Sequence, residues 1–408
     1  MSGPILVVNA GSSSIKFAAY EAENAQTSNL RFRGQVEGIG SAPHMIAWDG
    51  RGLKIAERYW PNNEGVGHEE ILGILTAWIS EQIDRRPLSA AGHRIVHGGL
   101  QFPGPVLVDS NILHALDLLC PLAPLHQPHN IAAIRAIAAV APSLPQVACF
   151  DTAFHRSQPE IARRFALPRE LHDAGVRRYG FHGLSYEYIA SVLRTRAPRL
   201  AAGRVIVAHL GAGASLCAML DGKSVDTTMG FTALDGLPMG TRCGALDPGV
   251  VLYLLRDRGM NAATIETLLY NRSGLLGVSG LSGDMRELLA ATDKHAKEAI
   301  ELFVYRICRE IGALTATLGG LDGLVFTGGI GEHSSEIRSR VCEASRWLGC
   351  QVDPVANQSG AECISTPESD ISVWVVATNE EKTIVRQTID VLEAGAAAVR
   401  THSRGRMA

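Results

Sequence analysis

Residues 5–20 read ILVVNAGSSSIKFAAY, and this stretch decides the fold. The apolar run Ile5–Val8 predicts a buried strand, and a second strand begins at Ile15. The small residues between them predict a tight turn at which a phosphate can approach the backbone. The pattern returns in residues 204–220, RVIVAHLGAGASLCAML. Two such hairpins predict a duplicated domain, and two related domains that face each other leave a cleft, where ligands usually bind.

Outside the hairpins, helical and extended patterns alternate along the chain. Helices are expected near residues 67–83, 110–120, 129–140, 184–196 and 334–347, and in a segment that ends near residue 400. Strands are expected at residues 146–150, 323–327 and 371–377. Residues 226–249 are rich in glycine and lack a period, which is typical of a functional loop or of disorder. Helices alternating with strands, together with the hairpins, predict an α/β architecture with mixed sheets.

Composition narrows the class of protein. The chain has 408 residues, which is long enough for two or three domains. Hydrophobic residues make up 46% and charged residues 19%, an ordinary balance for a globular protein. A net charge of −3 argues against a nucleic-acid or membrane partner. The short apolar run near the N-terminus lacks a basic region before it, so no signal peptide is expected. Eight scattered cysteines without a CxxC pair predict neither disulfides nor zinc, and indicate a reducing cytoplasm.

Three glycine-rich turns indicate phosphate chemistry. They lie around Gly11, Gly211 and Gly328–Gly331, each directly after a predicted strand, and none has the GxxxxGK[ST] pattern. Any one of them is explained as well by a steric need for a tight turn. Their joint occurrence after three strands favours a cradle for phosphate, which phosphoryl transfer requires together with a metal cation and positive charge.

Charged residues in loops supply candidate partners for a phosphate. Arg94 and Arg242 stand among glycines, so they can approach an anion closely, although a lone arginine is usually a solvated surface group. His126 and His182 also lie in loops. Asp151 follows a predicted strand at its carboxyl end, where open α/β sheets keep their ligands, but it also suits a turn or helix cap.

Residues 378–381 open the final predicted helix. Thr378 with Glu381 three residues later forms a capping-box pattern. Glu380 is then left to reach a hydrated Mg²⁺. Its charge at a helix start is explained equally well by the helix dipole.

Taken together, these motifs resemble the acetate kinase family within the sugar kinase/Hsp70/actin superfamily. The matching segments occur in family order over nearly the whole chain and lie at residues 8–16, 92–99, 123–126, 150–155, 178–183, 226–232, 240–242, 282–286, 327–332 and 378–381. The resemblance implies two duplicated actin-like ATPase domains that face a central cleft. It implies domains at 1–151 plus 385–408 and at 152–384, and a homodimer formed mainly through the second domain.

The resemblance also implies an activity: reversible, Mg²⁺-dependent transfer of the ATP γ-phosphoryl group to acetate, giving acetyl phosphate and ADP in the cytoplasm. Mn²⁺ could replace Mg²⁺. The implied catalytic residues are Asp151, Arg94, His182 and Arg242. The implied acyl pocket consists of Val96, Leu125 and Phe181 beside Arg94, and the implied metal ligands are Asn9 and Glu380. The implied nucleotide and phosphate contacts are Ser12, Ser14, Lys16, His126, His209, Gly211, Ala212, Gly213, Asp284, Arg286, Gly329, Ile330 and Gly331.

Three positions depart from the family pattern. Ala212 stands where an asparagine is usual, so it lacks an amide that would face the phosphates, and His333 replaces an asparagine beside the nucleoside. Ala233 stands where proline is common. Two alternatives stay open at this point: a kinase for propionate or butyrate, and a nucleotide-binding protein of this fold with weakened transfer activity.

Overall fold

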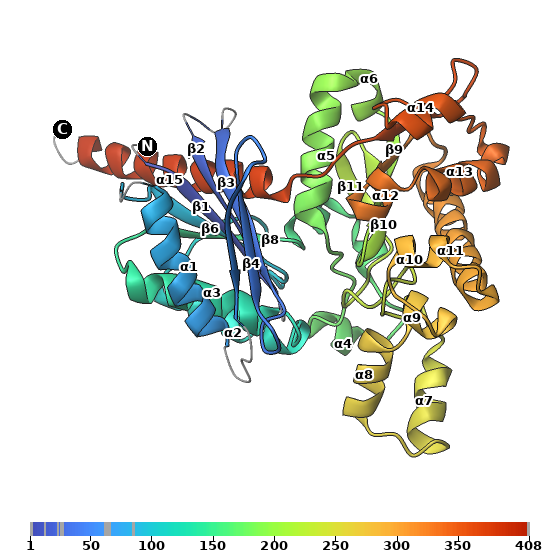
Figure 1. Ribbon diagram of the computed structural model, residues 1–408, viewed down its shortest axis with the longest axis horizontal. Helices are drawn as coiled ribbons and strands as arrows, with labels where there is room; N and C mark the ends of the chain where they lie inside the picture. The colour runs from blue at the N-terminus through green and yellow to red at the C-terminus, as the bar shows by residue number, and fades with distance from the viewer. Residues whose placement is uncertain are drawn as a thin grey trace. The chain divides into compact units, whose positions relative to one another are not determined.

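The computed structural model describes residues 3–11, 14–22, 24, 28–60, 67–83 and 86–405, without the side chains of residues 22, 69 and 398–405. The chain forms two compact units (Figure 1). The first consists of Met1–Ala153 with Asn379–Ala408, and the second of Phe154–Thr378. The boundary expected between residues 384 and 385 falls inside a helix, α15 (Glu380–Gly405), whereas the observed division precedes this helix.

The first unit contains an eight-stranded mixed sheet in the order β5-β4-β3-β2-β1-β6-β8-β7. Strands β1, β6 and β8 are parallel, and the other pairs are antiparallel. Its strands are β1 (Ile5–Ala10), β2 (Ser14–Ala22), β3 (Ser28–Glu37), β4 (His44–Asp49), β5 (Lys54–Tyr59), β6 (Ala90–Ile95), β7 (Val106–Leu107) and β8 (Gln146–Phe150). The predicted first hairpin is therefore β1–β2.

The second unit contains a five-stranded mixed sheet in the order β11-β10-β9-β12-β13. Its strands are β9 (Arg204–Leu210), β10 (Ala214–Leu220), β11 (Lys223–Thr227), β12 (Gly323–Thr327) and β13 (Ser372–Val375). This order and these strand directions repeat those of β3-β2-β1-β6-β8 in the first sheet, with two antiparallel pairs followed by two parallel pairs. The repetition supports the duplication inferred from the hairpins.

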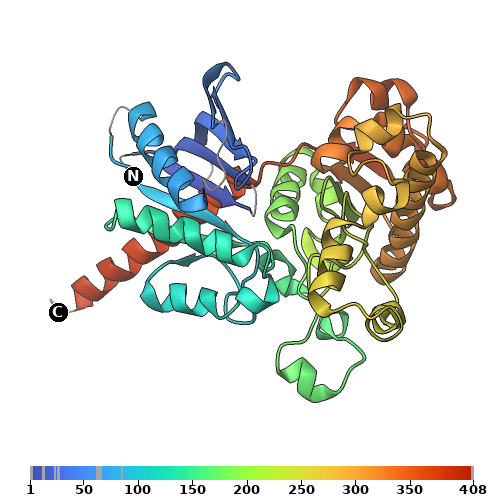
Figure 2. The ribbon, with the colours of Figure 1, turned by 60° about the horizontal axis from the view of Figure 1, so that its bottom comes forward.

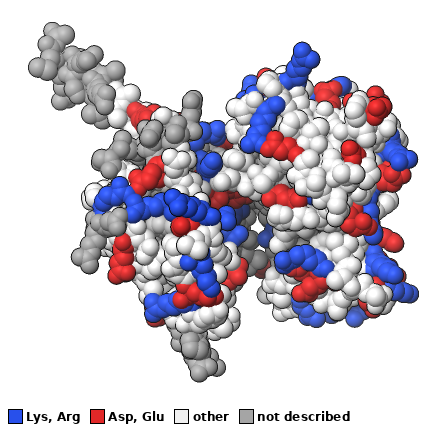
Figure 3. All heavy atoms as spheres, turned by 45° about the horizontal axis from the view of Figure 1, so that its top comes forward, with Lys and Arg blue, Asp and Glu red and all other residues white. Residues whose placement is uncertain are grey.

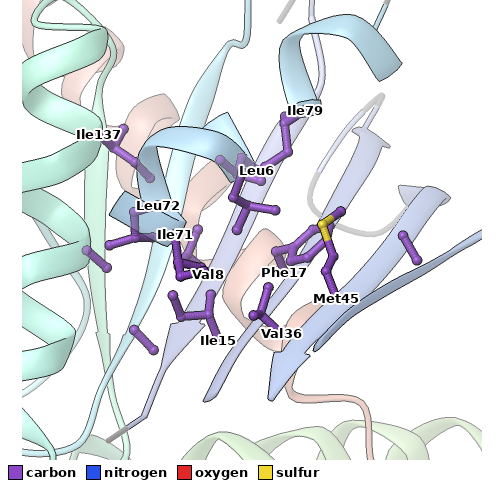
Figure 4. Close-up of a cluster of buried hydrophobic side chains, with 14 of the residues drawn as sticks. Leu6, Val8, Ile15, Phe17, Val36, Met45, Ile71, Leu72, Ile79 and Ile137 are labelled. Carbon is purple, nitrogen blue, oxygen red and sulfur yellow. The ribbon is translucent and has the colours of Figure 1, made fainter. Parts of the chain in front are cut away.

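Helices cover both faces of the first sheet. Leu6 and Val8 of β1 point to a hydrophobic cluster that includes Ile71 and Ile137, from α1 (His68–Gln82) and α3 (Gln127–Val140) (Figure 4). The opposite face packs against α15. A methyl group added at Gly92 would lie 2.5 Å from Thr388 Oγ1, so only glycine allows this close approach. In Figures 1 and 2, α15 lies with the elements of the first unit although it is far from them in sequence. The remaining helices are α2 (Ser110–Asp117) and the 3₁₀ turn Cys120–Leu122, and a further 3₁₀ turn, Ala153–Ser157, begins at the last residue of the segment Met1–Ala153 and continues into the second unit.

The second sheet is also covered on both faces. Helix α5 (Gly183–Arg196) packs on Val205, Val207 and Cys217, and α11 (Lys294–Leu318) contacts β9, β10 and β11. The other helical segments are Glu160–Arg163 (3₁₀), α4 (Arg169–Asp173), α6 (Pro198–Ala201), α7 (Pro248–Arg256), α8 (Ala262–Asn271), α9 (Gly274–Ser279), α10 (Met285–Ala290), α12 (Gly328–His333), α13 (Ser335–Ala344), Arg346–Leu348 (3₁₀) and α14 (Pro354–Ser359).

Most predicted elements are present. Strands at 146–150 and 323–327 match β8 and β12, and residues 228–247 form no helix or strand. The predicted capping box at α15 is wrong. Asn379 caps the helix, since its Oδ1 accepts from Lys382 N at 2.9 Å, while Thr378 Oγ1 is hydrogen-bonded to Ser185 Oγ at 2.8 Å.

On the face shown in Figure 3, basic and acidic side chains lie intermixed. Among the residues the structure describes, no helix is long and apolar enough to cross a membrane.

Candidate active site

In the first unit, strand alternation brings three predicted residues to one face. Val7 pairs with Gly92, and Arg94 pairs with Cys149. Side chains two positions apart on a strand share a face, so Asn9, Arg94 and Asp151 all follow the face that α15 covers. Glu380 opens α15 and joins this group. The carboxyl ends of three parallel strands therefore carry one polar cluster.

Arg94 is the centre of this cluster. Its Nη2 and Nε donate to Asp151 Oδ2 at 2.6 and 3.1 Å, and its Nη1 donates to Asn9 Oδ1 at 3.2 Å. Glu380 Oε2 lies 3.8 Å from Arg94 Nε. Asp151 is buried, whereas Arg94 and Glu380 keep about a fifth of their side-chain surface exposed, at 20% and 19%. The guanidinium is thus held by both Asp151 and Asn9, and a fifth of the Arg94 side chain remains exposed.

The cluster carries more negative than positive charge. Burial raises the pKa of Glu380, and repulsion from Glu381 adds to the rise, while Arg94 and Lys16 oppose it. Burial alone would lower the pKa of Arg94, but Asp151 and Glu380 outweigh it, so that pKa is raised. Arg94 therefore stays protonated, and the excess negative charge of the cluster would favour binding of a further cation.

A metal ion suits this donor set. Asn9 and Glu380 offer an amide and a carboxylate oxygen, and Mg²⁺ typically takes one or two carboxylates together with water and substrate phosphates. Such a site needs no cluster of three protein ligands, and within the described ranges no group of three or more His, Cys, Asp or Glu side chains could hold a metal. The residues present fit a hydrated Mg²⁺ or Mn²⁺.

Asn130 and Gln127 were not predicted, yet they brace this cluster. Asn130 donates from Nδ2 to Ala10 O at 2.5 Å and accepts from Val96 N at 3.0 Å, so one buried amide joins the ends of β1 and β6. Gln127 likewise bonds to both backbone groups of His97. Both amides lie at the start of α3, just after His126, and a polar residue in the first turn of a buried helix was the available sequence signal.

The other predicted residues of the first unit lie near these strand ends. Lys16 is exposed and pairs in register with Asn9, and Ser14 O accepts from Gly11 N at 2.7 Å. Val96 is buried and Leu125 half-buried, whereas Phe181, predicted for the same acyl pocket, belongs to the second unit. Ser12 lies outside the described residues.

In the second unit, His182 occupies a constrained turn. Its backbone is left-handed, with φ +58°, directly before α5. Its Nδ1 is hydrogen-bonded to Ser215 Oγ at 2.8 Å, and Ser215 also bonds to the hydroxyl of Tyr186. A methyl group added at Gly213 would lie 3.2 Å from His182 Nε2. The ring is therefore fixed with Nε2 over the glycine-rich turn.

His209 and Arg242 complete this group. The His209 ring stacks on His182 at 4.3 Å, and its Nδ1 is hydrogen-bonded to Ser185 Oγ at 2.9 Å. Arg242 Nη1 lies 3.9 Å from the same added methyl group at Gly213 and donates to Ala233 O at 3.2 Å. The structure thus brings His182 and Arg242 together at Gly213.

A cavity of about 580 Å³ adjoins the same turn. Its lining includes six residues predicted for the nucleotide, namely Gly211, Ala212, Asp284, Arg286, Gly329 and Ile330. His333, which the sequence placed beside the nucleoside, also lines the cavity. The other lining residues had no predicted role there, namely Gly240, Thr241, Gly283, Met285, Leu289 and Ser334. Gly213 and Gly331 are not in the lining. Gly213 O accepts from Gly211 N at 3.0 Å, and Gly331 is buried within α12.

Asp284 and Arg286 have a structural role as well as a place in this wall. Asp284 caps α10 by accepting from Arg286 N at 2.8 Å, and its carboxylate pairs with the Arg286 guanidinium. The hydrogen bond from the Arg286 side chain lowers the pKa of Asp284 to about 2. Arg286 is largely exposed, so it can turn toward a bound ligand.

Glu332 ties two strand ends together beside this cavity. Its Oε1 accepts from Gly328 N at 2.8 Å and from Thr378 N at 3.0 Å, which fixes the residues after β12 and β13. Gly328 has φ +76° and packs on Leu210, so the turn requires glycine. The predicted glycine-rich turn at Gly328–Gly331 is therefore held in one conformation beside the cavity.

Comparison with known proteins identifies the family. The Acetokinase family profile matches residues 4–386. The chain belongs to the acetokinase family. This is a family of carboxylate kinases, and the resemblance seen in the sequence is confirmed.

Relatives in the acetokinase family match over their full length. The acetate kinase of Rhodopseudomonas palustris is 58% identical over 399 residues, which cover 97% of this chain and 100% of that protein. The acetate kinase of Rhizobium meliloti is 46% identical over 390 residues, or 96% and 98% of the two chains.

Solved acetokinase structures share the fold. A propionate kinase from Francisella tularensis superposes with a TM-score of 0.88 at 38% identity, covering 94% of this chain and 98% of its own. The Porphyromonas gingivalis acetate kinase gives 0.83 at 36% identity, covering 96% and 100%. The predicted fold class, an actin-like α/β fold with two mixed sheets, is confirmed.

Proposed function

We propose that this chain transfers the γ-phosphoryl group of ATP reversibly to acetate, giving acetyl phosphate and ADP. One observation carries the proposal. Gly211 and Ala212 line the 580 Å³ cavity, and the next residue, Gly213, lies against His182 Nε2 and Arg242 Nη1. A nucleoside in this cavity would direct its phosphates toward these two groups. Donors aimed at developing charge are what phosphoryl transfer needs from a protein.

The roles follow from the chemistry. The acid is already ionised at neutral pH, so an oxygen of its carboxylate can attack the γ-phosphorus without a base. The new P–O bond forms in line as the bond to the β-phosphate oxygen breaks, and ADP leaves. His182 and Arg242 would stabilise charge on the equatorial oxygens. Arg94, oriented by Asp151, would hold the acid, with Val96, Leu125 and Phe181 around its alkyl group.

The remaining predicted residues would bind ATP and its cation. Asn9 and Glu380 would hold Mg²⁺, which neutralises phosphate charge when bound. Ser12, Ser14, Lys16, His126 and His209 would contact phosphates. Of the cavity residues named above, Gly211 and Ala212 would face the phosphates and the others would contact the nucleoside, with Gly213 and Gly331 shaping the turns.

A second candidate function is propionate kinase activity. The observation favouring it is that a protein titled propionate kinase shares this fold at a TM-score of 0.88. Propionate is one methylene larger than acetate, which is worth only about 0.8 kcal/mol of burial, so pocket size rather than affinity must discriminate.

One assay separates these functions. Purified protein is incubated with ATP, Mg²⁺ and acetate, propionate or butyrate, and acyl phosphate is trapped with hydroxylamine. We expect rapid product with acetate and slower product with propionate. Faster product with propionate would replace the proposal with the second candidate. Nucleotide binding without product for any acid would show a binding protein with lost transfer activity.

We also propose a homodimer in the cytoplasm. Helix α7, in the second unit (Figure 1), has no buried residue, and it exposes Leu252 and Tyr253 by 47% and 49%. Exposed apolar surface of this kind often marks an interface. None of the eight cysteines, all of which the structure describes, forms a disulfide, which suits a reducing compartment. Light scattering that gives a monomer mass would overturn the dimer.

A further inference from the structure

A second cavity, of about 240 Å³, lies in the second unit and plays no part in the proposed function. Its lining includes two thiols, Cys342 and Cys350, together with Thr366, Glu343 and Arg346. Cys342 and Cys350 are 3% and 2% exposed, so both are buried residues that line this cavity.

The chain path brings the two thiols together. Helix α13 ends at Ala344, and the 3₁₀ turn Arg346–Leu348 leads to Gly349, which has φ +82°. This reversal returns Cys350 to the helix that carries Cys342. Asp370 N donates to Gly349 O at 3.0 Å, and Gln351 N donates to Ser369 Oγ at 2.9 Å, so the return is fixed on both sides of Cys350.

The thiols influence one another. A hydrogen bond with Cys342 lowers the pKa of Cys350 against the opposing effect of burial. The same bond, together with burial, raises the pKa of Cys342. By contrast, Cys217 is enclosed within β10, where burial raises its pKa to about 12. A thiolate is the reactive form of cysteine, so Cys350 is the better nucleophile.

The wall of this cavity offers a hydrogen-bonding group to a small polar molecule. Thr366 Oγ1 is buried in the same wall and, in the described part of the chain, has no hydrogen-bond partner. A buried hydroxyl usually has one, supplied by protein or by a small molecule such as water. Hydrogen peroxide is a small molecule that can both donate and accept hydrogen bonds.

We propose that Cys342 and Cys350 form an oxidant-responsive dithiol site, which hydrogen peroxide entering this cavity converts to a disulfide. The Cys350 sulfur attacks the peroxide, so an S–O bond forms, the O–O bond breaks and water leaves with the thiol proton. The Cys342 sulfur then attacks the sulfur of the resulting sulfenic acid, so the S–S bond forms, the S–O bond breaks and a second water leaves with the Cys342 thiol proton. In total, two thiols are oxidised and one peroxide is reduced to two waters. In a reducing compartment, such a disulfide would be transient, as redox-sensing disulfides are.

Peptide mapping tests the proposal without any activity assay. Trypsin cuts after Arg340, Arg346 and Lys382, so Cys342 and Cys350 fall on separate peptides. The second peptide also contains the exposed Cys363, so the Cys363→Ser variant is used as the starting protein. It is treated with hydrogen peroxide, alkylated, digested without reductant and analysed by mass spectrometry. We expect residues 341–346 disulfide-linked to residues 347–382, and Cys350 consumed at least about tenfold faster than Cys217.

Two further variants keep the result specific. In Cys342→Ser, Cys350 should stop at sulfenic acid, which dimedone captures, and reductant-reversible cross-linking should disappear. In Cys350→Ser, Cys342 should remain a thiol. Intact Cys342 and Cys350 at a peroxide dose that fully oxidises Cys363 in the unaltered chain would overturn the proposal. So would oxidation of either residue to sulfinic acid without the linked peptide.

Discussion

Arg94 donates to both carboxylate oxygens of Asp151, at 2.6 Å from Nη2 to Oδ2 and at 3.3 Å from Nε to Oδ1. The pair joins the ends of β6 and β8 and leaves Nη1 directed to Asn9. A bidentate contact fixes the plane of a guanidinium as well as its position. Asp151 would therefore act on the substrate through Arg94.

The Asp151→Asn variant tests this positioning. The amide keeps the shape but loses the charge and one acceptor, so Arg94 becomes less well oriented. Misplacement of a binding group by about 1 Å costs about 10²-fold, and we expect kcat/KM for acetate to fall by this factor. The control is Asp117→Asn, which removes an exposed partner of Arg135 in the same unit and should leave the kinetics unchanged. Equal effects of the two variants would contradict the role of Asp151.

Arg242→Ala should reduce turnover by several orders of magnitude while the fold stays intact. Loss of a cation at a transferring phosphoryl group costs on the order of 3–5 kcal/mol. The measurement is kcat together with the melting temperature. Arg340→Ala, which removes an exposed helix-surface arginine, serves as the control. Near-normal turnover at an unchanged melting temperature would remove Arg242 from the site.

Ala212→Asn should strengthen phosphate contact. Ala212 lines the larger cavity, and its backbone is held where its carbonyl accepts from Gly240 N at 3.1 Å. An added amide would contribute roughly one hydrogen bond, about 1 kcal/mol, which is a severalfold gain in ATP affinity or kcat. Isothermal titration and initial rates measure the two quantities. A loss in both would show that the turn has already compensated for the missing amide.

Acid should destabilise the fold through buried histidines. His155 is buried and bonded to Ser224 and to Phe181 O, and burial lowers its pKa from 6.5 to about 4. Between these values the unfolded chain binds the additional proton, so the stabilisation is complete above pH 6.5 and is lost as the pH falls to about 4. Each such histidine contributes up to about 1.4 kcal/mol per pH unit.

The measurement is the melting temperature between pH 7 and pH 4.5. His155→Gln should flatten its dependence on pH, whereas His114→Gln, at an exposed position, should not. His93 and His97, whose pKa values burial also lowers to about 4, account for the slope that remains. An identical slope in His155→Gln would show that His155 is already protonated in the fold.

Val96→Ala tests the choice of acid. Val96 is buried two residues after Arg94, and its N–H donates to Asn130. Removing its branched side chain should open the acyl pocket and move the ratio of kcat/KM toward propionate by roughly tenfold. The melting temperature is measured in parallel. An unmoved ratio with a lowered melting temperature would make Val96 a core residue.

Local pattern was sufficient to predict some elements and not others. β8 was predicted to the residue because its last four residues form an apolar, fully buried run that ends at Asp151. β5 was missed because it is an exposed edge strand with no periodic burial. Thr378 and Asn379 both suit a helix cap, and a contact with Ser185, far away in sequence, decided between them.

Some residues of the candidate site could be predicted from local sequence, and others could not. Arg94, Asp151 and His182 were predicted because each has a reactive side chain within a recognisable motif. Asn130 and Ser215 were missed because neither lies in a recognisable motif, although Asn130 is a polar residue in the first turn of a buried helix. Their roles depend on partners distant in sequence, Ala10 for Asn130 and His182 for Ser215. Supporting residues of this kind become visible only when the strands are assembled.

Helix α15 has a consequence for how the protein is made. It packs on β1, β6 and β8 of the first unit, yet the ribosome synthesises it after the whole of the second unit. During translation the second unit can fold while the first still lacks the helix that covers Val7 and Gly92. The nascent first sheet therefore presents an apolar face to the cell for as long as some 225 residues take to emerge, or roughly 10–45 s at typical elongation rates. A chaperone that binds nascent chains would find its target on this face. A chain truncated within β13 would lack α15, so this face of the first sheet would stay uncovered.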